Sequence, residues 1–251
     1  MTPFHVVIPA RHASTRFPGK PLALLAGKPM IRHVWEHGCA SGAASIVGGD
    51  DDERIATAAR GFGAEVALTR ADHVSGTERV AEVAAARRWP DDAIVVNLQG
   101  DAPLMPAAGL RQVAALLATH PGAAIATLCT RLASPADYRN PNVVKVVMDR
   151  DGRALYFSRA PIPFVAHGEE RTPDAWRHLG LYAYRAGGLK ELARAAPCHL
   201  ETVEKLEQLR ALWLGMEIRV GVATAAHGPD VDTPEDVALV ERFLAGQESE
   251  A

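Results

Sequence analysis

Short apolar runs rich in β-branched residues alternate with longer segments of helical periodicity, and this alternation constrains the fold more than any other feature. Strands are expected at Phe4–Ile8, Ser45–Val47, Glu65–Leu68, Ala93–Leu98 and Ala124–Cys129, and helices at Pro29–Ala40, Asp52–Gly61, Gly76–Arg88 and Pro106–His120. Successive strand, helix and strand segments form right-handed βαβ units. The pattern therefore predicts an α/β fold of three layers, in which helices flank a Rossmann-like, mostly parallel sheet.

The alternation changes in the second half of the chain. Three strand-like segments follow one another with no full helix between them, at Val143–Met148, Ala154–Phe157 and Leu179–Tyr184. The earlier rhythm then resumes with a helix at Thr202–Leu214, a strand at Ile218–Val222 and a helix at Thr233–Ala245. We therefore expect a single domain, 1–251, with a small antiparallel β insertion at about 140–190.

Composition excludes several classes of protein. The chain has 27 basic and 30 acidic side chains and a net charge of −3, with no basic stripe for a nucleic-acid duplex. No apolar run approaches the ~20 residues that a membrane span needs, and the start of the chain has no signal-peptide pattern. Its three cysteines are too far apart for a disulfide framework or a zinc knuckle. The expectation is a cytoplasmic protein that binds neither nucleic acid nor membrane.

The first 35 residues contain five cations and no acidic residue, which suggests a seat for a small polyanion. Three of these cations, Arg11, Arg16 and Lys20, lie in the loop that follows the first strand, where small residues allow backbone N–H groups to approach phosphates. The loop is not a Walker A motif, because Ser14 replaces its first glycine and Pro21 its magnesium-binding hydroxyl. The alternative is an ordinary solvated loop.

Two acidic segments also follow predicted strands. Asp101 comes directly after the strand that ends at Leu98, and Asp232 follows the last strand. Since ligands bind beyond the carboxyl ends of parallel strands, both carboxylates could face one cleft and hold Mg²⁺ together with substrate phosphates. The alternatives are helix capping or a turn for Asp101, and for Asp232 a capping box that begins at Thr233-Pro234.

Two weaker signals complete the set. The segment Ser75-Gly76-Thr77 opens a predicted helix, whose N-terminus could bind an anion or the edge of a base, although capping explains it equally well. His178 and Tyr182 are four residues apart in a predicted strand, so they share a face and could bind a polyol. Signatures of metalloproteases, serine hydrolases and dinucleotide-binding enzymes are absent from the sequence. Nucleotidyl transfer is consistent with the remaining features.

These clusters together resemble the 3-deoxy-manno-octulosonate cytidylyltransferase (CMP-Kdo synthetase) family of the sugar nucleotidyltransferase fold. The resemblance extends from about Val6 to Glu241. The matching segments are Pro9–Leu22, Thr69–His73, Ser75–Arg79, Gln99–Asp101, Asn140–Lys145, Leu155–Arg159, Arg177–Gly180, Leu206–Arg210 and Val231–Asp236. The first of these segments alone indicates only a nucleotidyltransferase, whereas the combination is specific.

The resemblance implies transfer of CMP from CTP to the anomeric hydroxyl of 3-deoxy-D-manno-octulosonate (Kdo), for the lipopolysaccharide inner core. It implies four catalytic residues: Arg16, Lys20, Asp101 and Asp232. It implies Mg²⁺ as cofactor, held by Asp101 and Asp232. Its nucleotide-binding set is Ala10, Arg11, Ser14, Arg16, Lys20, Arg70, Ser75, Gly76, Thr77 and Asp101. Its sugar-binding set is Arg79, Gln99, Arg159, His178, Tyr182, Glu207 and Gln208. It also implies a homodimer formed through the β insertion, with Tyr156 or Arg159 near the partner.

Two departures from the family pattern leave alternatives open. The family commonly has Gln-Gly-Asp-Glu-Pro where this chain has Ala102, and Ala-Thr-Asp where it has Gly49-Asp50-Asp51. Ala102 removes a carboxylate beside the proposed metal ligand. Asp50 and Asp51 make the end of the second predicted strand more acidic. The alternatives are a cytidylyltransferase for another acceptor, such as 8-amino-Kdo, sialate or a methylerythritol phosphate, and a non-catalytic nucleotide-binding homologue.

Overall fold

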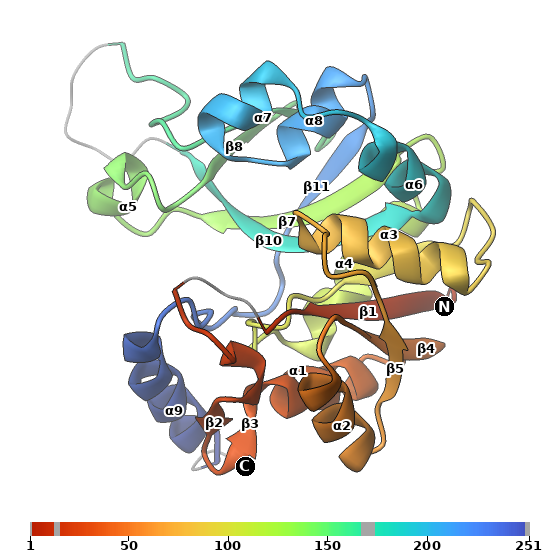
Figure 1. Cartoon of the computed structure of the whole chain (residues 1–251). Helices are drawn as coiled ribbons and strands as arrows, with labels where there is room; N and C mark the ends of the chain where they lie inside the picture. Colours follow the sequence, from red (N-terminus) through yellow and green to blue (C-terminus); the bar gives the residue numbers. More distant parts are fainter. Residues whose placement is uncertain (1, 13–15, 167–173, 249–251) are drawn as a thin grey trace.

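A nine-stranded sheet runs through the molecule in the order β11-β7-β10-β6-β1-β4-β5, with β8 against β10 and β9 against β8 (Figure 1). The computed structural model describes residues 2–12, 16–166 and 174–248. The strands are β1 (Phe4–Ala10), β4 (Ser45–Asp50), β5 (Glu65–Leu68), β6 (Ile94–Asn97), β7 (Ile125–Arg131), β8 (Lys145–Met148), β9 (Ala154–Ser158), β10 (Trp176–Arg185) and β11 (Ile218–Val222), with β2 (Leu24–Leu25) and β3 (Lys28–Pro29) as a separate pair.

Strand direction confirms the mostly parallel sheet. β1 pairs in parallel with β4 and β6, β4 with β5, and β7 with β11, whereas β10 runs antiparallel to both of its long neighbours, β6 and β7. The carboxyl ends of β1, β4 and β6 therefore lie at one edge of the sheet, where ligands bind in folds of this kind.

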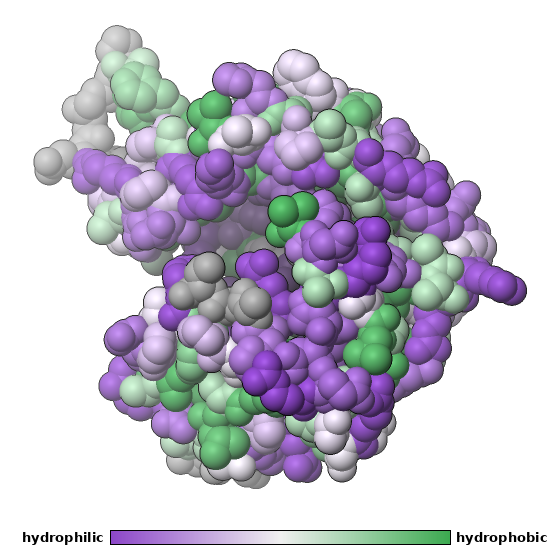
Figure 2. Space-filling view, in the orientation of Figure 1, coloured by the Kyte–Doolittle hydropathy of each residue, from purple (hydrophilic) through white to green (hydrophobic). Residues whose placement is uncertain are grey.

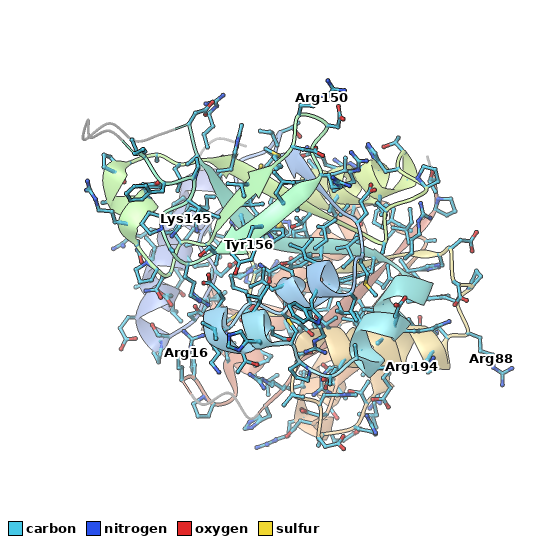
Figure 3. The ribbon with its side chains drawn as sticks, turned by 90° about the horizontal axis from the view of Figure 1, so that it is seen from above. Arg16, Arg88, Lys145, Arg150, Tyr156 and Arg194 are labelled. Atoms are coloured by element: carbon cyan, nitrogen blue, oxygen red, sulfur yellow. The ribbon has the colours of Figure 1, made fainter. Side chains whose placement is uncertain are left out.

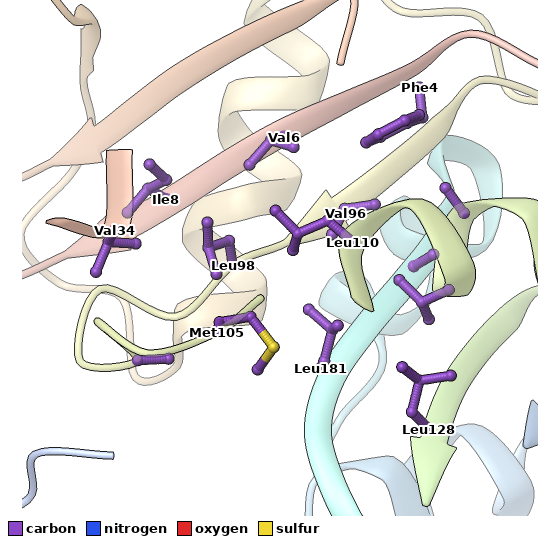
Figure 4. Packing of buried hydrophobic residues seen from close by; sticks show 14 of the residues in the cluster. Phe4, Val6, Ile8, Val34, Val96, Leu98, Met105, Leu110, Leu128 and Leu181 are labelled. Carbon is purple, nitrogen blue, oxygen red and sulfur yellow. The ribbon is translucent and has the colours of Figure 1, made fainter. Parts of the chain in front are cut away.

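Helices cover both faces of the sheet, which confirms the three layers. They are α1 (Met30–Ala40), α2 (Glu53–Gly61), α3 (Gly76–Ala86), α4 (Ala107–Ala118), α5 (Pro135–Arg139), α6 (Ala186–Arg194), α7 (His199–Glu204), α8 (Gln208–Trp213) and α9 (Pro234–Glu248), with a 3-10 turn at Lys20–Leu22. Each face of the sheet has its own apolar core, and alternate residues of β1 contribute to the two cores. Phe4, Val6 and Ile8 pack with α1, α2 and α4 (Figure 4), whereas Val7 packs with α3 and α6.

The C-terminal helix packs beside the N-terminal part of the chain (Figure 1). A small third core joins Leu25 and Met30 to Val231 and Val240, all four of them buried. Burial of this apolar surface holds the segment before α9 next to the loop that follows β1. Residues separated by more than 200 positions in the sequence thereby reach the same end of the sheet.

Two sequence-based expectations need correction. β10 is not confined to an insertion, because its second half pairs with β6 and β7 inside the main sheet. The helix expected at Thr202–Leu214 is divided into α7 and α8, since Lys205 between them adopts a left-handed conformation with φ of 54°. Sequence patterns also missed α5 and α6. No helix in the described ranges is long and apolar enough to cross a membrane.

Lys145, in β8, has a completely buried side chain. Its ammonium group donates hydrogen bonds to the carbonyl oxygens of Asn140 (3.0 Å), Val143 (2.6 Å) and Arg159 (2.6 Å). Burial lowers the pKa of this ammonium group, but three acceptors match its three donors. Figure 3 shows Lys145 inside the outline of the molecule, whereas Arg88 and Arg150 project from its edge. One side chain thus fastens the start of β8 to the end of β9.

We expect Lys145→Met to lower the free energy of unfolding by about 3 kcal/mol, because it leaves buried carbonyl groups without donors. Urea unfolding followed by circular dichroism measures the change. Lys190→Met is the matched control, since Lys190 pairs at 2.8 Å with the exposed Asp91, and it should cost less than about 0.5 kcal/mol. Equal losses in the two variants would contradict this role for Lys145.

Candidate active site

Two glycines allow the loop after β1 to approach the turn after β6. Gly19 has φ of +71° and donates from its backbone N–H to the carbonyl of His12 at 3.0 Å. This bond closes the loop after β1 that carries Arg11, Arg16 and Lys20, called the basic loop below. A methyl group on Gly100 would lie only 2.8 Å from the carbonyl oxygen of Pro9. Glycine is therefore required where Asp101 is brought against the end of β1.

Lys20 links three distant parts of the chain. Its ammonium group donates to Oδ2 of Asp101 at 2.6 Å and to the carbonyl oxygen of Val231 at 2.9 Å, and its side chain is only 11% exposed. The backbone N–H of Val231 donates in turn to the carbonyl of Asp101 at 2.9 Å. The carboxylate after β6 and the segment after β11 are therefore fixed to each other and to the basic loop.

Asp232 belongs to the same cluster. Its carboxylate accepts a hydrogen bond from the guanidinium of Arg16 at 2.9 Å. Helix capping does not use this carboxylate, because Oδ2 of Asp236 accepts from the backbone N–H groups of Asp232 (2.9 Å) and Thr233 (2.8 Å). The alternative of pure helix geometry therefore accounts for Asp236 and leaves the carboxylate of Asp232 facing Arg16.

A third carboxylate, which sequence analysis did not single out as a ligand, lies beside these two. Burial, together with the negative charges of Asp101 and Asp232, raises the pKa of Asp230 to about 7. Asp230 therefore lies within electrostatic range of Asp101 and Asp232. Oxygen donors of this kind suit Mg²⁺. Within the described ranges, no group of three acidic, histidine or cysteine side chains is arranged to hold a metal ion.

A polar cavity of about 260 Å³ opens beside this cluster. The basic loop contributes Arg11, Arg16 and Lys20 to its lining, and Ala10, Gln99 and Asp101 contribute from the strand ends. The N-terminus of α3 faces the cavity through Ser75 and Gly76, with backbone N–H groups suited to an anion. Figure 2 shows a hollow with hydrophilic walls between the two halves of the molecule. Cations and a helix N-terminus therefore converge on one space.

Arg79 closes one side of this cavity. Its guanidinium is buried, pairs with Asp51 at 2.7 Å and also bonds the hydroxyl of Thr69. Asp51 in turn accepts from the backbone N–H of His12 at 3.4 Å. Arg79, expected in the sugar-binding set, therefore lines the same cavity as Arg11, Arg16 and Lys20, because its guanidinium pairs with Asp51 just after β4. Sequence analysis noted Asp51 only as part of a departure from the family.

Asp50, the last residue of β4 and the neighbour of Asp51, has an unusual environment. Its side chain is 1% exposed, and neither of its carboxylate oxygens has a hydrogen-bond partner in the described structure. Burial raises its pKa to about 7, although the nearby Arg79 partly opposes the shift. Ala102, the other departure, is buried in the core and offers no second carboxylate.

A second, smaller cavity of about 130 Å³ lies between β10, α8 and the start of α3. Its lining includes four residues of the expected sugar-binding set: Gln99, Tyr182, Glu207 and Gln208. Thr77 and Tyr184 also line it. Thr77, which the family resemblance placed in the nucleotide-binding set, therefore lines this cavity together with residues of the expected sugar-binding set. The reason is that its hydroxyl donates to Glu207 at 2.7 Å.

His178 stands behind this cavity, against Tyr182. The centres of the two rings are 5.3 Å apart, as their shared face predicted. Two extra residues, Gly180 and Leu181, bulge out of β10 between them, so the alternation of faces is kept. Burial lowers the pKa of His178 to about 3, and its Nε2 lies 2.9 Å from the hydroxyl of Thr127. The imidazole is therefore neutral near pH 7.

Two expected residues lie elsewhere. Arg70 is exposed beside Asp72 and Glu82, outside the lining of both cavities. The guanidinium of Arg159 donates to the carbonyl oxygens of Pro141 (2.9 Å) and Glu204 (2.8 Å), so it binds the end of α7 instead of either cavity. Carbonyl acceptors, which a sequence does not show, decide this orientation. Ser14 lies outside the described residues.

Comparisons with known proteins agree with the geometry. A sequence profile of the cytidylyltransferase family matches residues 5–218. The chain is 56% identical over 253 residues to a 3-deoxy-manno-octulosonate cytidylyltransferase of Alkalilimnicola ehrlichii, covering 98% of each chain. It is 52% identical over 250 residues to the enzyme of the same name from Pseudomonas fluorescens, covering 97% of this chain and 98% of that one.

Solved structures give the same result. The structure of CMP:2-keto-3-deoxy-manno-octonic acid synthetase complexed with CTP superposes with a TM-score of 0.90 at 38% identity, over 98% of this chain and 100% of that chain. A 4-diphosphocytidyl-2C-methyl-D-erythritol synthase has a TM-score of 0.63 at 12% identity, over 96% of this chain and 98% of the other. The second comparison is evidence for the fold alone.

The buried Asp50 predicts a dependence of stability on pH. The pKa of Asp50 is about 7 in the folded protein and 3.8 as its ordinary value. The stabilisation that its proton gives the folded state is therefore fully present below pH 3.8 and is lost as the pH rises through 7. We expect Asp50→Asn to remove this loss. The advantage of the variant in free energy of unfolding should grow by on the order of 2 kcal/mol between pH 5 and pH 8.

Chemical denaturation at several pH values measures this difference. Asp91→Asn serves as control, because the Asp91 carboxylate is exposed and its hydrogen bond with Lys190 lowers its pKa. That variant should follow the wild-type profile between pH 5 and pH 8. Parallel profiles for Asp50→Asn and the wild type would show that Asp50 does not titrate in this range.

Proposed function

Because this chain belongs to the 3-deoxy-manno-octulosonate cytidylyltransferase family, we propose that it transfers CMP from CTP to the anomeric hydroxyl of Kdo. The products are CMP-Kdo and pyrophosphate. The convergence of Lys20, Asp101 and the segment at Asp232 beside a cation-lined cavity carries the proposal. These contacts join the loop after β1, the turn after β6 and the segment before α9.

The basic loop and the start of α3 would hold the nucleotide. Arg11, Arg16 and Lys20 would supply positive charge for the triphosphate, and Ser75 and Gly76, which line the same cavity, would face the cytosine and ribose. Arg79, fixed by Asp51, adds a buried cation to the same wall. Charges held in place before the substrate arrives stabilise charge that develops during phosphoryl transfer.

Asp101 and Asp232 would hold Mg²⁺, with Asp230 as a neighbouring carboxylate. Their oxygen donors fit this ion, and one or two carboxylates with phosphate oxygens are its usual ligands in such sites. When bound, Mg²⁺ would neutralise negative charge on the phosphates. In the structure, Lys20 and Arg16 pair with these two carboxylates. A triphosphate would attract the same two cations, which frees the carboxylates for the metal.

The proposed reaction is a direct displacement. The anomeric oxygen of Kdo attacks the α-phosphorus of CTP in line, the bond to the bridging oxygen of the β-phosphate breaks, and pyrophosphate leaves with that electron pair. The hydroxyl proton passes to solvent. Positioning and electrostatic stabilisation are enough for such chemistry, so no covalent nucleophile of the protein takes part. Lys20 and Arg16 act here by orienting phosphate groups.

The second cavity is the proposed seat of the acceptor sugar. Tyr182, Glu207 and Gln208 present hydroxyl, carboxylate and amide groups, which suit the hydroxyl-rich part of an acid sugar. His178 supports Tyr182 by ring contact. Gln99 lines both cavities, so donor and acceptor would meet beside it.

Other parts of the proposal rest on the family resemblance. Large apolar side chains are exposed on β9 and after it, at Leu155 and Phe164, which favours an interface in a homodimer. A homodimer, a cytoplasmic location and a role in lipopolysaccharide inner-core synthesis stay predictions. So does the contact of Tyr156 or Arg159 with a partner subunit.

An acceptor panel tests the function. Pyrophosphate release from CTP and Mg²⁺ is measured with Kdo, 8-amino-Kdo, sialate and methylerythritol phosphate in turn. We expect release with Kdo and CMP-Kdo as the product identified by mass spectrometry. Turnover with another acceptor alone would assign a different cytidylyltransferase, and CTP binding without turnover of any acceptor would favour a non-catalytic homologue.

Asp101→Asn tests the proposed metal ligand. Loss of one preorganised charge is expected to lower turnover by about two to three orders of magnitude, and to raise the Mg²⁺ concentration needed for half activity. Asp91→Asn, at an exposed aspartate outside both cavities, is the matched control and should retain wild-type turnover. Similar turnover for Asp101→Asn and Asp91→Asn would rule out this role for Asp101.

A further inference from the structure

Glu207 lies on the turn between α7 and α8. Lys205 makes this turn with its left-handed backbone, and Leu206 and Leu209 anchor it through buried side chains. Glu207 stands at the N-cap position of α8, but its side chain does not cap that helix. The carboxylate extends instead toward the first turn of α3, about 130 residues away in the sequence.

Both carboxylate oxygens of Glu207 are held by hydroxyl groups. Ser75 donates to Oε1 at 3.0 Å, and Thr77 donates to Oε2 at 2.7 Å. The nearest cation is already used, because Arg210 forms two hydrogen bonds with Glu201, at 2.7 and 2.5 Å. Burial raises the pKa of Glu207, and the two hydroxyl donors partly oppose the shift. Neutral donors therefore fix the orientation of this carboxylate.

The fixed carboxylate has acceptor capacity to spare. An ionised carboxylate offers about four lone-pair positions, and Ser75 and Thr77 use two. Glu207 lines the second cavity together with Tyr182 and Gln208. A negative charge in this wall repels an anionic group and attracts hydroxyl donors. The hydroxyl groups of an acceptor, and not its carboxylate, are therefore the suitable partners.

We infer that Thr77, assisted by Ser75, is a positioning residue that orients Glu207 to accept hydroxyl groups of the acceptor sugar. The inference rests on the proposed function, since it takes the second cavity as the acceptor seat. It gives α3 two tasks. Its N-terminus and Ser75 border the nucleotide cavity, whereas the hydroxyl of Thr77 serves the neighbouring cavity. Affinity for the acceptor then depends on a residue of the nucleotide-binding segment.

Thr77 separates this role from capping better than Ser75 does. The hydroxyl of Ser75 also accepts from the backbone N–H of Glu78 at 3.2 Å, so its removal weakens the helix end as well. Thr77→Val deletes the donor and keeps the shape of the side chain. Thr119→Val is the matched control, because the hydroxyl of Thr119 contacts the end of α4 and the adjacent His120.

Steady-state kinetics with CTP and Kdo provide the test. Loss of a hydrogen bond to a buried carboxylate should raise KM for Kdo about ten-fold or more in Thr77→Val, with KM for CTP changed less than about two-fold. Thr77→Ser should restore KM for Kdo, and Thr119→Val should match the wild type. Glu207→Gln should raise KM for Kdo as well, and its effect and that of Thr77→Val should be far from additive in the double variant.

Three outcomes would overturn the inference: equal rises of both KM values, no rise in KM for Kdo, or additive effects of Thr77→Val and Glu207→Gln. If Thr77→Val fails to fold in a thermal unfolding measurement, Glu207→Gln and Thr77→Ser decide by the same ratio of KM values. The wild type separates this inference from the proposed function. Turnover of Kdo by the wild type with unchanged kinetics of the variants would refute the positioning role alone, whereas no turnover by the wild type would refute both.

Discussion

The contact between Lys20, Asp101 and Val231 is the constraint on which the site depends. A single ammonium group, mostly shielded from solvent, joins the loop after β1, the turn after β6 and the segment before α9. A buried charge of this kind is stable only while it is paired. Folding that pairs the ammonium group of Lys20 therefore also brings together the cations and carboxylates of the proposed nucleoside triphosphate site.

Close backbone packing makes this contact possible. The carbonyl of Pro9 approaches the turn after β6 so closely that Gly100 cannot carry a side chain. On the other side, the small core around Met30 and Val231 brings the C-terminal segment into reach. The site is thus held by packing on two sides of one end of the sheet, and the polar residues complete a geometry that backbone and apolar contacts have set.

The sequence predicted the layers of the fold because apolar periodicity depends on local spacing. It also predicted that Asp101 and Asp232 could face one cleft, since each belongs to a segment that follows a strand, and both carboxylates pair with cations of the loop after β1. It could not show on which side Thr77 and Arg79 would lie. Their directions depend on Glu207 and Asp51, which come from other parts of the chain. Membership of a site could be predicted from the order of elements, whereas the division of residues between two cavities required the tertiary partners.

The helix division at Lys205 has the same origin. Lysine favours helices, yet this residue adopts a left-handed conformation, and the turn that it forms carries Glu207 to α3. β10 has a comparable position in the architecture. It carries Tyr182 and Tyr184 at the second cavity, and its other end pairs with β8, which bears the β9 hairpin. This strand therefore joins the wall of the second cavity directly to the outer β8–β9 hairpin.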